Sequence, residues 1–505
     1  GAFTRFKYWQ DFELEDGNRD HGNSGSGYES GAPLSDDGFS ENAKFSGISL
    51  LDAYVYGSFD VADMPLDVRL GRQVVSWGES TFIQGGMNSS NPFDVSALRR
   101  PGATLKEGIL PVGMAYLNLG ATENLSIEAF YQYEWAKTEI DGCGTLFGAD
   151  FAASGCDYVT FGADDATALA AGFAVERTAD VDAKDDGQYG LALRYFAEEL
   201  NNTEFGIYAM NIHSRVPLIS GTRNSNPGIA AAGIPATALG TAAAVPFINS
   251  AENTVIAADG TTLGSVAAQY NASYYIEFPE DLKFYGLSFA TNAGGVALSG
   301  EVSYKPDTPI QVNGNHLLTA VLTESTAATP FAQRVIDTAP GESAQGWDAF
   351  DVTQIQFTAI QFMDRVLGAS RVTLIGEVGA ILVDGVEDSE FLYGRDTVYG
   401  LGVESDGGYV TDSSWGYRTK AVLDYSDVFA GVSLKPSVSF SHDVDGYSPA
   451  PGQQFNEGRQ SLGLSVEAIY QQAYSATIAY KMSDGGDYNA SKDKDFVSLS
   501  LGMTY

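Results

Sequence analysis

The chain has 505 residues, of which 57 are glycine and 12% are aromatic, and its formal net charge is -37. This charge excludes a general affinity for nucleic acid, which needs clustered Lys and Arg. No run of about eighteen apolar residues occurs, which excludes a membrane-spanning helix, and no linker-like change in composition divides the chain. We therefore expect one domain over residues 1–505.

Apolar and polar side chains alternate with a period of two along most of the chain. The segments 125–135, 296–305, 474–482 and 497–505 show this alternation most clearly, with Glu128, Glu301, Ser475 and Lys481 on the polar face. A strand with one face toward lipid and one toward a wet lumen produces this pattern. A soluble β-sandwich would also alternate, but the length and number of the strands favour an outer-membrane barrel.

The sequence predicts a closed, antiparallel, transmembrane β-barrel of about sixteen strands, with an inward-folded plug segment and long external loops. In chain order the strands are expected near 3–14, 46–60, 65–77, 111–120, 123–137, 187–197, 203–214, 282–292, 295–305, 351–362, 370–382, 416–427, 432–443, 460–471, 473–483 and 494–505. Short turns then alternate with long loops, and with an even number of strands both chain termini are expected on the periplasmic side. The segment 269–278 resembles a strand but would break this alternation, so it is placed in a loop.

The chain opens at Gly1 without a basic and then apolar segment, so any signal peptide is expected to have been removed or omitted. Export must therefore be inferred from other features. Cys143 and Cys156 lie close together in a Gly/Asp-rich loop, which indicates a local disulfide in an exported protein. Two unrelated thiols are the alternative.

The segment 81–111 joins two strands and is unusually basic for so acidic a chain. If it folds into the barrel, its cations could pair with inward carboxylates and fix it as a plug; a folding latch with no role in passage is the alternative. Arg72 is out of step with Arg69, so a bulge at Gly71 would be needed to bring both inward. The plug and lumen candidates are Arg69, Arg72, Trp77, Glu79, Asp94, Arg99, Arg100, Lys106, Glu107, Glu128, Glu134, Glu301 and Glu377.

The long external loops, expected at 215–281 and 306–350, contain less polar stretches. Residues 228–248 are rich in alanine, and 317–337 carry apolar residues at helical spacing. Such helical pieces could collect a hydrophobic ligand or could pack against neighbouring loops. Acidic runs at 16–20, 36–37 and 180–186 could bind divalent cations that bridge to lipopolysaccharide, or could be simply solvated. No other cofactor and no metal site is expected.

Catalysis would need a base, and the chain offers His21, His213, His316 and His442. None lies in a nucleophile motif. His442 beside Asp443 is the best pair, although Gly446 and Pro449 indicate a loop-entry turn there. We therefore expect no enzymatic activity. The aromatic ending at Tyr505 resembles the signal read by the barrel assembly machinery.

Several motifs resemble the proteobacterial outer-membrane family known as domain of unknown function 1302. They are the run from Arg69 to Ser80, its continuation from Asn91 to Gly102, and the shorter stretches at 128–132, 278–281, 300–304 and 442–449. The resemblance implies an integral protein of the Gram-negative outer membrane. It also implies proximity to inner-membrane exporters of the lipid type and to a periplasmic or lipoprotein partner.

From these observations we expect transport of hydrophobic or amphipathic, lipid-like small molecules across the outer membrane. A general porin for polar solutes is one alternative. A structural or adaptor barrel that docks a periplasmic and inner-membrane transport complex is another.

Overall fold

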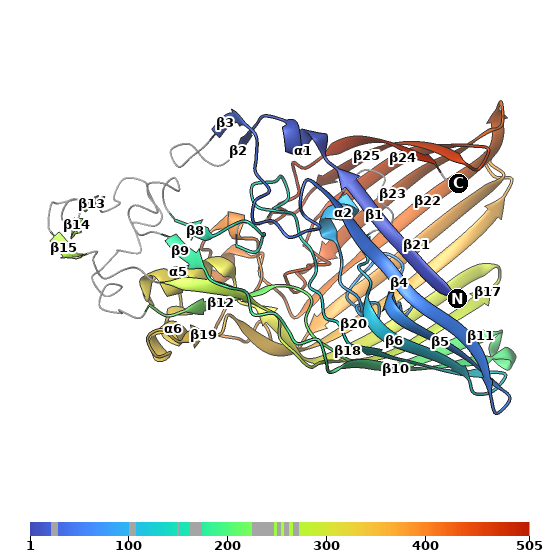
Figure 1. Cartoon of the computed structure of the whole chain (residues 1–505), viewed down its shortest axis with the longest axis horizontal. Coiled ribbons are helices and arrows are strands. Elements are labelled where there is room, and N and C mark those ends of the chain that lie inside the picture. The colour runs from blue at the N-terminus through green and yellow to red at the C-terminus, as the bar shows by residue number, and fades with distance from the viewer. Residues whose placement is uncertain are drawn as a thin grey trace.

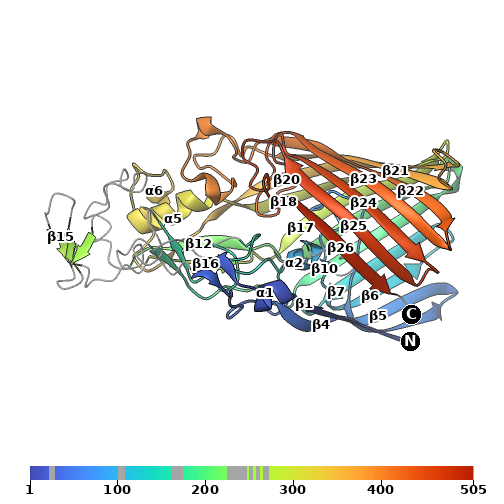
Figure 2. The same cartoon turned by 90° about the horizontal axis from the view of Figure 1, so that it is seen from above.

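The main body of the protein is a sixteen-stranded antiparallel sheet rolled into a barrel wall (Figures 1 and 2). The computed structural model describes residues 1–21, 29–99, 108–148, 151–161, 174–224, 247–249, 254–256, 262–265 and 272–503. Pairing runs in sequence order along the wall, and no ladder pair joins the described residues of its first strand to those of its last. The wall strands are β1 (Ala2–Gln10), β4 (Ser46–Val61), β5 (Met64–Gln73), β6 (Val112–Gly120), β7 (Leu125–Gln132), β10 (Gln188–Ala197), β11 (Thr203–Ile212), β17 (Leu282–Ala293), β18 (Val296–Gln311), β20 (Trp347–Asp364), β21 (Arg371–Val383), β22 (Ser413–Phe429), β23 (Val432–Asp445), β24 (Gln460–Tyr470), β25 (Tyr474–Asp484) and β26 (Phe496–Met503).

All sixteen strands expected from the alternation are present, so the predicted fold is confirmed. Two bounds differ in a way that matters for the lumen. β5 ends at Gln73 rather than near residue 77, and β7 ends at Gln132 rather than near 137. β18 and β20 extend to Gln311 and from Trp347, so the loop between them is shorter than expected.

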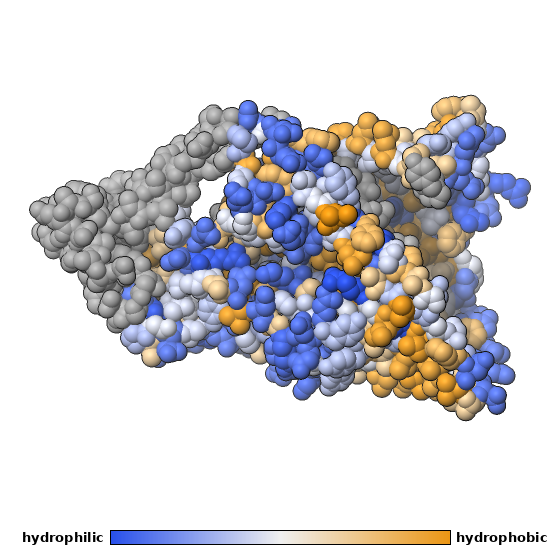
Figure 3. Space-filling view, in the orientation of Figure 1, coloured by the Kyte–Doolittle hydropathy of each residue, from blue (hydrophilic) through white to orange (hydrophobic). Residues whose placement is uncertain are grey.

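The two faces of the wall differ as the alternation predicts. On β26 the outward Leu499 and Leu501 are 70% and 79% exposed, whereas the inward Ser498 is 8% exposed. Figure 3 shows apolar side chains gathered over the wall, with polar residues over the loop half and at the opposite tip. In the described part of the chain, no helix is long and apolar enough to cross a membrane.

Short turns lie at one end of the wall, the end at which β1 begins and β26 ends (Figure 1). The turn between β4 and β5 has only two residues, Ala62 and Asp63, both at positive φ (52° and 66°). This is the turn geometry that suits the twist of paired strands. The 3-10 helix η1 (Glu198–Leu200) lies in another of these turns.

The long loops at the other end build a separate external body. Its five-stranded sheet has the order β19 (Ser343–Ala344), β12 (Leu218–Thr222), β16 (Ser273–Glu277), β9 (Ala174–Arg177), β8 (Tyr158–Thr160). The segment that resembled a strand at 269–278 thus contains a strand of this sheet and none of the wall.

The remaining elements of the described chain are α1 (Phe12–Asp16), β2 (Arg19–His21), β3 (Glu29–Ala32), α2 (Val95–Arg99), β13 (Phe247–Asn249), β14 (Thr254–Ile256), β15 (Thr262–Ser265), α5 (Gly314–Thr323), α6 (Ala332–Asp337), η4 (Thr397–Tyr399) and η5 (Glu404–Asp406).

The apolar residues of loop 317–337 are used in packing. Leu317, Val321 and Phe331 of this loop are each at most 1% exposed and pack with Ile219 and Ile276 of the external sheet. They therefore form the core of the external body and present no open apolar surface. Most of the alanine-rich stretch 228–248 lies outside the described residues.

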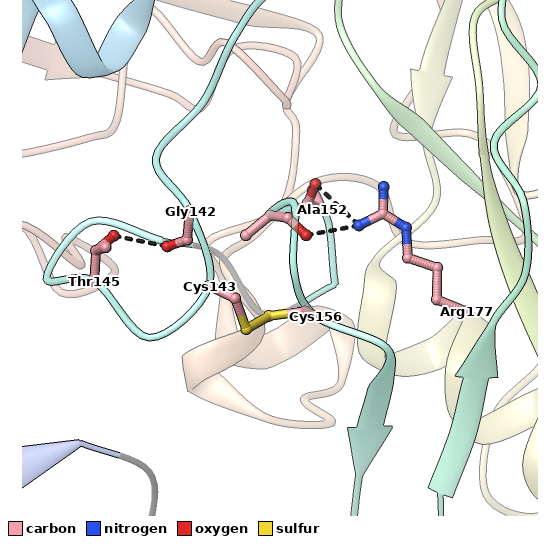
Figure 4. The surroundings of a disulfide bond; sticks show 7 residues. Gly142, Cys143, Thr145, Ala152, Cys156 and Arg177 are labelled. Carbon is pink, nitrogen blue, oxygen red and sulfur yellow. Dashed lines mark hydrogen bonds between the residues drawn. A yellow bond between two sulfur atoms is a disulfide. The ribbon is translucent and has the colours of Figure 1, made fainter. Parts of the chain in front are cut away.

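The predicted disulfide between Cys143 and Cys156 is present, with 5.3 Å between their Cα atoms (Figure 4). It closes a loop beside β9, where Arg177 donates hydrogen bonds to the carbonyl oxygens of Ala152 and Ala153. The bond and the guanidinium together fasten this loop to the external sheet.

Replacing Cys143 and Cys156 with Ser should loosen this loop without unfolding the barrel. The entropic model gives about 3 kcal/mol for a cross-link over a loop of this size. Limited proteolysis should cut the double variant between residues 143 and 156, while the heat-modifiable mobility of the barrel stays as in the wild type. A loop that resists proteolysis equally in both proteins would contradict this assignment.

Candidate functional site

A stretch of chain that follows β5 runs inside the barrel; we call residues 74–99 the luminal segment. The wall reaches it from several sides. Gln132 of β7 donates to the Ser90 carbonyl (2.9 Å), Lys305 of β18 to that of Gly85 (2.8 Å) and Gln354 of β20 to that of Gln84 (3.1 Å). The segment begins where β5 ends, so Trp77 and Glu79 belong to it and not to the wall.

Glu301 on β18 holds the segment through backbone amides. One carboxylate oxygen accepts the N–H of Glu79 and the other accepts the N–H of Met87, each at 2.8 Å. The Glu301 side chain is buried, and a Cβ at either Gly78 or Gly86 would overlap with its oxygens. These two glycines therefore make room for the carboxylate.

Glu377 on β21 forms a second anchor of the same kind. Its oxygens accept the N–H groups of Thr81 (2.8 Å), Phe82 (2.7 Å) and Ile83 (2.7 Å). Thr358 on β20 adds a hydroxyl donor at 3.0 Å. A buried carboxylate is stabilised when several donors surround it, so no cation is required at either anchor.

A third carboxylate, Glu128 on β7, is neutralised by the wall. It accepts the Trp77 indole N–H (2.8 Å) and pairs with Arg194 of β10 (2.8 Å). Arg194 also pairs with Glu204 (2.9 Å) and lies 3.8 Å from Glu79. Sequence reasoning missed Arg194, although it shares the inward face of β10 with Gln188 and Ala192.

Asp94 is fully buried and pairs with Lys7 of β1 at 2.5 Å. Its other oxygen accepts the Ser96 hydroxyl and the Ala97 N–H at the start of α2. Lys7 was not predicted as a site residue. The pair fastens the far end of the luminal segment to the first wall strand.

Arg99, the cation of the luminal segment that lies within the described residues, does not make the expected pair with a wall carboxylate. Arg99 pairs with Asp141 of an external loop and lies 4.6 Å from the Phe147 ring centroid. Glu301 and Glu377 bind backbone N–H groups instead, because a segment without ladder partners leaves its amides to be satisfied. Arg100, Lys106, Glu107 and Tyr505 lie outside the described residues.

The bulge at Gly71 that would bring both Arg69 and Arg72 inward is absent. The registers of β5 with β4 and β6 pass through Gly71 without a shift, although its φ is 133°. Arg69 therefore lies inward, 4.1 Å from the Tyr116 ring centroid, while Arg72 stays on the face of Leu70 and pairs with Glu134. Arg72 and Glu134 bind each other at the end of β5 and do not hold the luminal segment.

Side chains of the luminal segment pack against β10, β17 and β21. Inward glycines of three wall strands receive its side chains: a Cβ at Gly190, Gly286 or Gly379 would lie 2.7, 2.5 or 2.7 Å from Trp77, Met87 or Ile83, respectively. Trp77 and Met87 are buried there in a cluster with Met114, Phe130 and Tyr208.

The opposite side, on β23 to β26, is different. A Cβ at the inward Gly463 or Gly502 would meet, within 4 Å, only the side chain of Ser439 or Ser475. No hydrogen bond or ion pair joins the described part of the luminal segment to these strands, although Gln84 donates its N–H to Gln454 in the loop that follows β23 (3.1 Å). Their inner faces carry a set of hydroxyls that we call the hydroxyl lane: Ser437, Ser439, Ser441, Ser461, Ser465, Ser475, Thr477, Ser483, Ser498 and Ser500.

His442 and Asp443, considered as a catalytic pair, point to opposite faces of β23. The His442 ring lies 5.7 Å from that of Tyr417, whereas the buried Asp443 pairs with Arg418 (2.6 Å) and Arg459 (2.7 Å). The two side chains therefore do not act on each other.

A family model described as "Protein of unknown function (DUF1302)" matches residues 1–505. No curated protein matches the chain. Among solved structures, a porin matches with 10% identity and a TM-score of 0.34, covering 92% of this chain and 96% of the porin. The outer membrane channel DcaP of Acinetobacter baumannii matches with 8% identity and a TM-score of 0.32, covering 100% and 96%. OccAB1 of the same organism matches with 10% identity and a TM-score of 0.34, covering 91% and 76%.

Replacing Gly78 with Ala should displace the luminal segment from Glu301. Both Gly78 (φ 80°) and Gly294 (φ 61°) are left-handed, but a Cβ at Gly294 would meet nothing within 4 Å. Hydrogen exchange of the amides of residues 79–87 should accelerate by about tenfold or more in Gly78→Ala, as for a loss of roughly 1.4 kcal/mol, and not in Gly294→Ala. Equal exchange in the two variants would show that Glu301 does not hold the segment.

The fit of the segment should also depend on pH through Glu79. Burial raises the pKa of Glu79 to about 7; Arg194 lowers it, and Glu204 and Glu301 raise it further. Because the packed form holds a proton that the solvated side chain releases at lower pH, packing should weaken as pH rises from about 5 to about 8. After correction for intrinsic exchange, the segment's amides should lose protection over this range in the wild type and much less in Glu79→Gln. Identical pH profiles would contradict this role of Glu79.

Proposed function

The chain belongs to the DUF1302 family, whose description assigns no activity, and from the geometry of its lumen we propose that it is an outer-membrane channel narrowed by the luminal segment. An outward apolar face, short turns at one end and long loops at the other are the features of barrels that span this membrane. Solutes would pass between the luminal segment and the hydroxyl lane.

The unequal filling of the lumen carries this proposal. On the side of β10, β17 and β21, the inward glycines lie against side chains of the luminal segment. On the side of β24 and β26, the inward glycines are adjacent only to serines. A segment that served purely as core packing would be expected to contact the whole lumen, whereas the described part of this one does not contact the inward glycines of β24 and β26.

The class of solute follows from the surface that stays free. Trp77, Met87 and Tyr208 are at most 2% exposed, so these apolar side chains are committed to packing. The lane opposite offers hydroxyl groups. We therefore propose small amphipathic or polar solutes; a wholly hydrophobic cargo would need an apolar track that the described lumen does not provide. The periplasmic or lipoprotein partner and the inner-membrane exporter implied by the family resemblance remain part of the proposal.

The channel proposal predicts a small conductance that rises when the anchors are weakened. In Glu301→Gln/Glu377→Gln, an amide replaces each carboxylate and loses charge-assisted hydrogen bonds to the segment. Single-channel conductance in planar bilayers should increase severalfold. Glu390→Gln, which removes an exposed external carboxylate, is the matched control and should leave conductance unchanged.

Two results would overturn the proposal. One is a wild-type barrel that conducts like a wide, open porin, because the segment would then not narrow it. The other is an anchor double variant that folds, yields to exchange in the luminal segment and still passes no more ions or small solutes than the wild type.

A further inference from the structure

One row of inward residues crosses four neighbouring strands of the hydroxyl lane and its edge. Ladder register pairs Lys420 of β22 with Ser439, Ser439 with Gly463, and Gly463 with Lys481 of β25. Lys420 shares the face of the buried Ser414, and Lys481 that of the buried Ser483. The two lysines thus stand on either side of a serine and a glycine.

The space between the lysines is open among the described residues. A Cβ at Gly463 would lie 2.5 Å from Ser439 Oγ and within 4 Å of no other residue. Lys481 is exposed although its side of the strand faces the lumen. With neighbouring strands about 4.8 Å apart, the two lysine backbones are separated by roughly 14 Å. Their flexible four-carbon stems can bring both ammonium groups toward one small ligand.

Most other inward cations have partners. Arg194 pairs with Glu128, and Lys435 lies 3.6 Å from Asp424. Within the described residues neither Lys420 nor Lys481 forms an ion pair. In a chain of net charge -37, two inward lysines that share a row without a carboxylate mark a local reversal of charge.

The adjacent rows sharpen this contrast. Next toward the external loops, Arg418 is followed across the strands by Ser441, Ser461 and Ser483. Arg418 and Arg459 both pair with the carboxylate of Asp443, and Glu377 is the register partner of Arg418. On the turn side, Lys435 lies 3.6 Å from Asp424 and is the register partner of Glu467. Cations and carboxylates therefore face one another in the adjacent rows, whereas the row itself carries two lysines and no carboxylate.

We propose that Lys420, Ser439, Gly463 and Lys481 form an anion-binding site in the lane, which takes the carboxylate or phosphate group of a passing solute. Ammonium and hydroxyl donors bind anionic oxygens through charge-assisted hydrogen bonds, and lysines in a pore favour anions. The inference rests on the proposed channel and deepens it, since it names small organic or inorganic anions as the solute class.

Reversal potentials under a KCl gradient test the inference. The wild type should prefer chloride to potassium, and Lys420→Gln/Lys481→Gln should lower this permeability ratio by about fivefold. The control Lys283→Gln/Lys492→Gln changes the net charge equally, from -37 to -39, but removes an outward lysine of β17 and an exposed loop lysine, and it should leave the ratio unchanged. The single variants Lys420→Gln and Lys481→Gln should each give part of the effect if the double variant does not assemble.

Binding of inorganic phosphate to the detergent-solubilised barrel, followed by phosphorus NMR line broadening, gives a readout that does not need conduction. Phosphate should broaden with the wild type and the control, and lose most of that effect with the lane variant. Acetate added as a competitor of phosphate in the same measurement separates carboxylate from phosphate preference. If Lys420→Gln/Lys481→Gln loses phosphate binding but the wild type shows no measurable conductance, the proposed channel is refuted and the proposed anion site is supported. A cation-selective wild type, or equal selectivity and equal phosphate binding in both double variants, would overturn the site.

Discussion

The structure inside the barrel depends on the need of backbone amides for partners. A chain that leaves the wall and enters the lumen gives up its ladder hydrogen bonds, and its N–H groups cannot stay buried and unpaired. Glu301 and Glu377 supply acceptors for five of these groups. The need is mutual, because a carboxylate removed from water is also costly unless donors surround it.

This mutual need explains why the lumen is filled unevenly. Glu301 lies on β18 and Glu377 on β21, so the luminal segment is held beside these two strands. Trp77 packs there in its cluster of buried apolar side chains. The remaining arc, β23 to β26, carries the small side chains of the hydroxyl lane on its inner face. The contacts that pack the luminal segment against β10, β17 and β21 therefore also leave space in the lumen beside β24 and β26.

The sequence was sufficient to predict the wall strands because a period of two follows directly from the geometry of a single strand. The polarity of a side chain such as Leu499 or Ser498 then indicates whether it faces lipid or the lumen. The sequence also identified Glu301, Glu377 and Trp77 as lumen residues. It did not predict their partners, because Lys7 meets Asp94 and Glu301 meets Met87 only once distant strands are placed around the barrel. The density of glycine at 78, 85 and 86 was the available signal that backbone, and not cations, would approach the wall carboxylates.

The separation of the anchors along the chain has a consequence for assembly. Glu301 lies 222 residues after Glu79, and Glu377 lies 296 residues after Thr81. Contacts between such distant residues form late, since the intervening chain must first be ordered. The luminal segment therefore cannot be locked until most of the wall has been laid down. A nascent barrel should therefore pass through a stage in which its interior is wide and its luminal segment is still free to move.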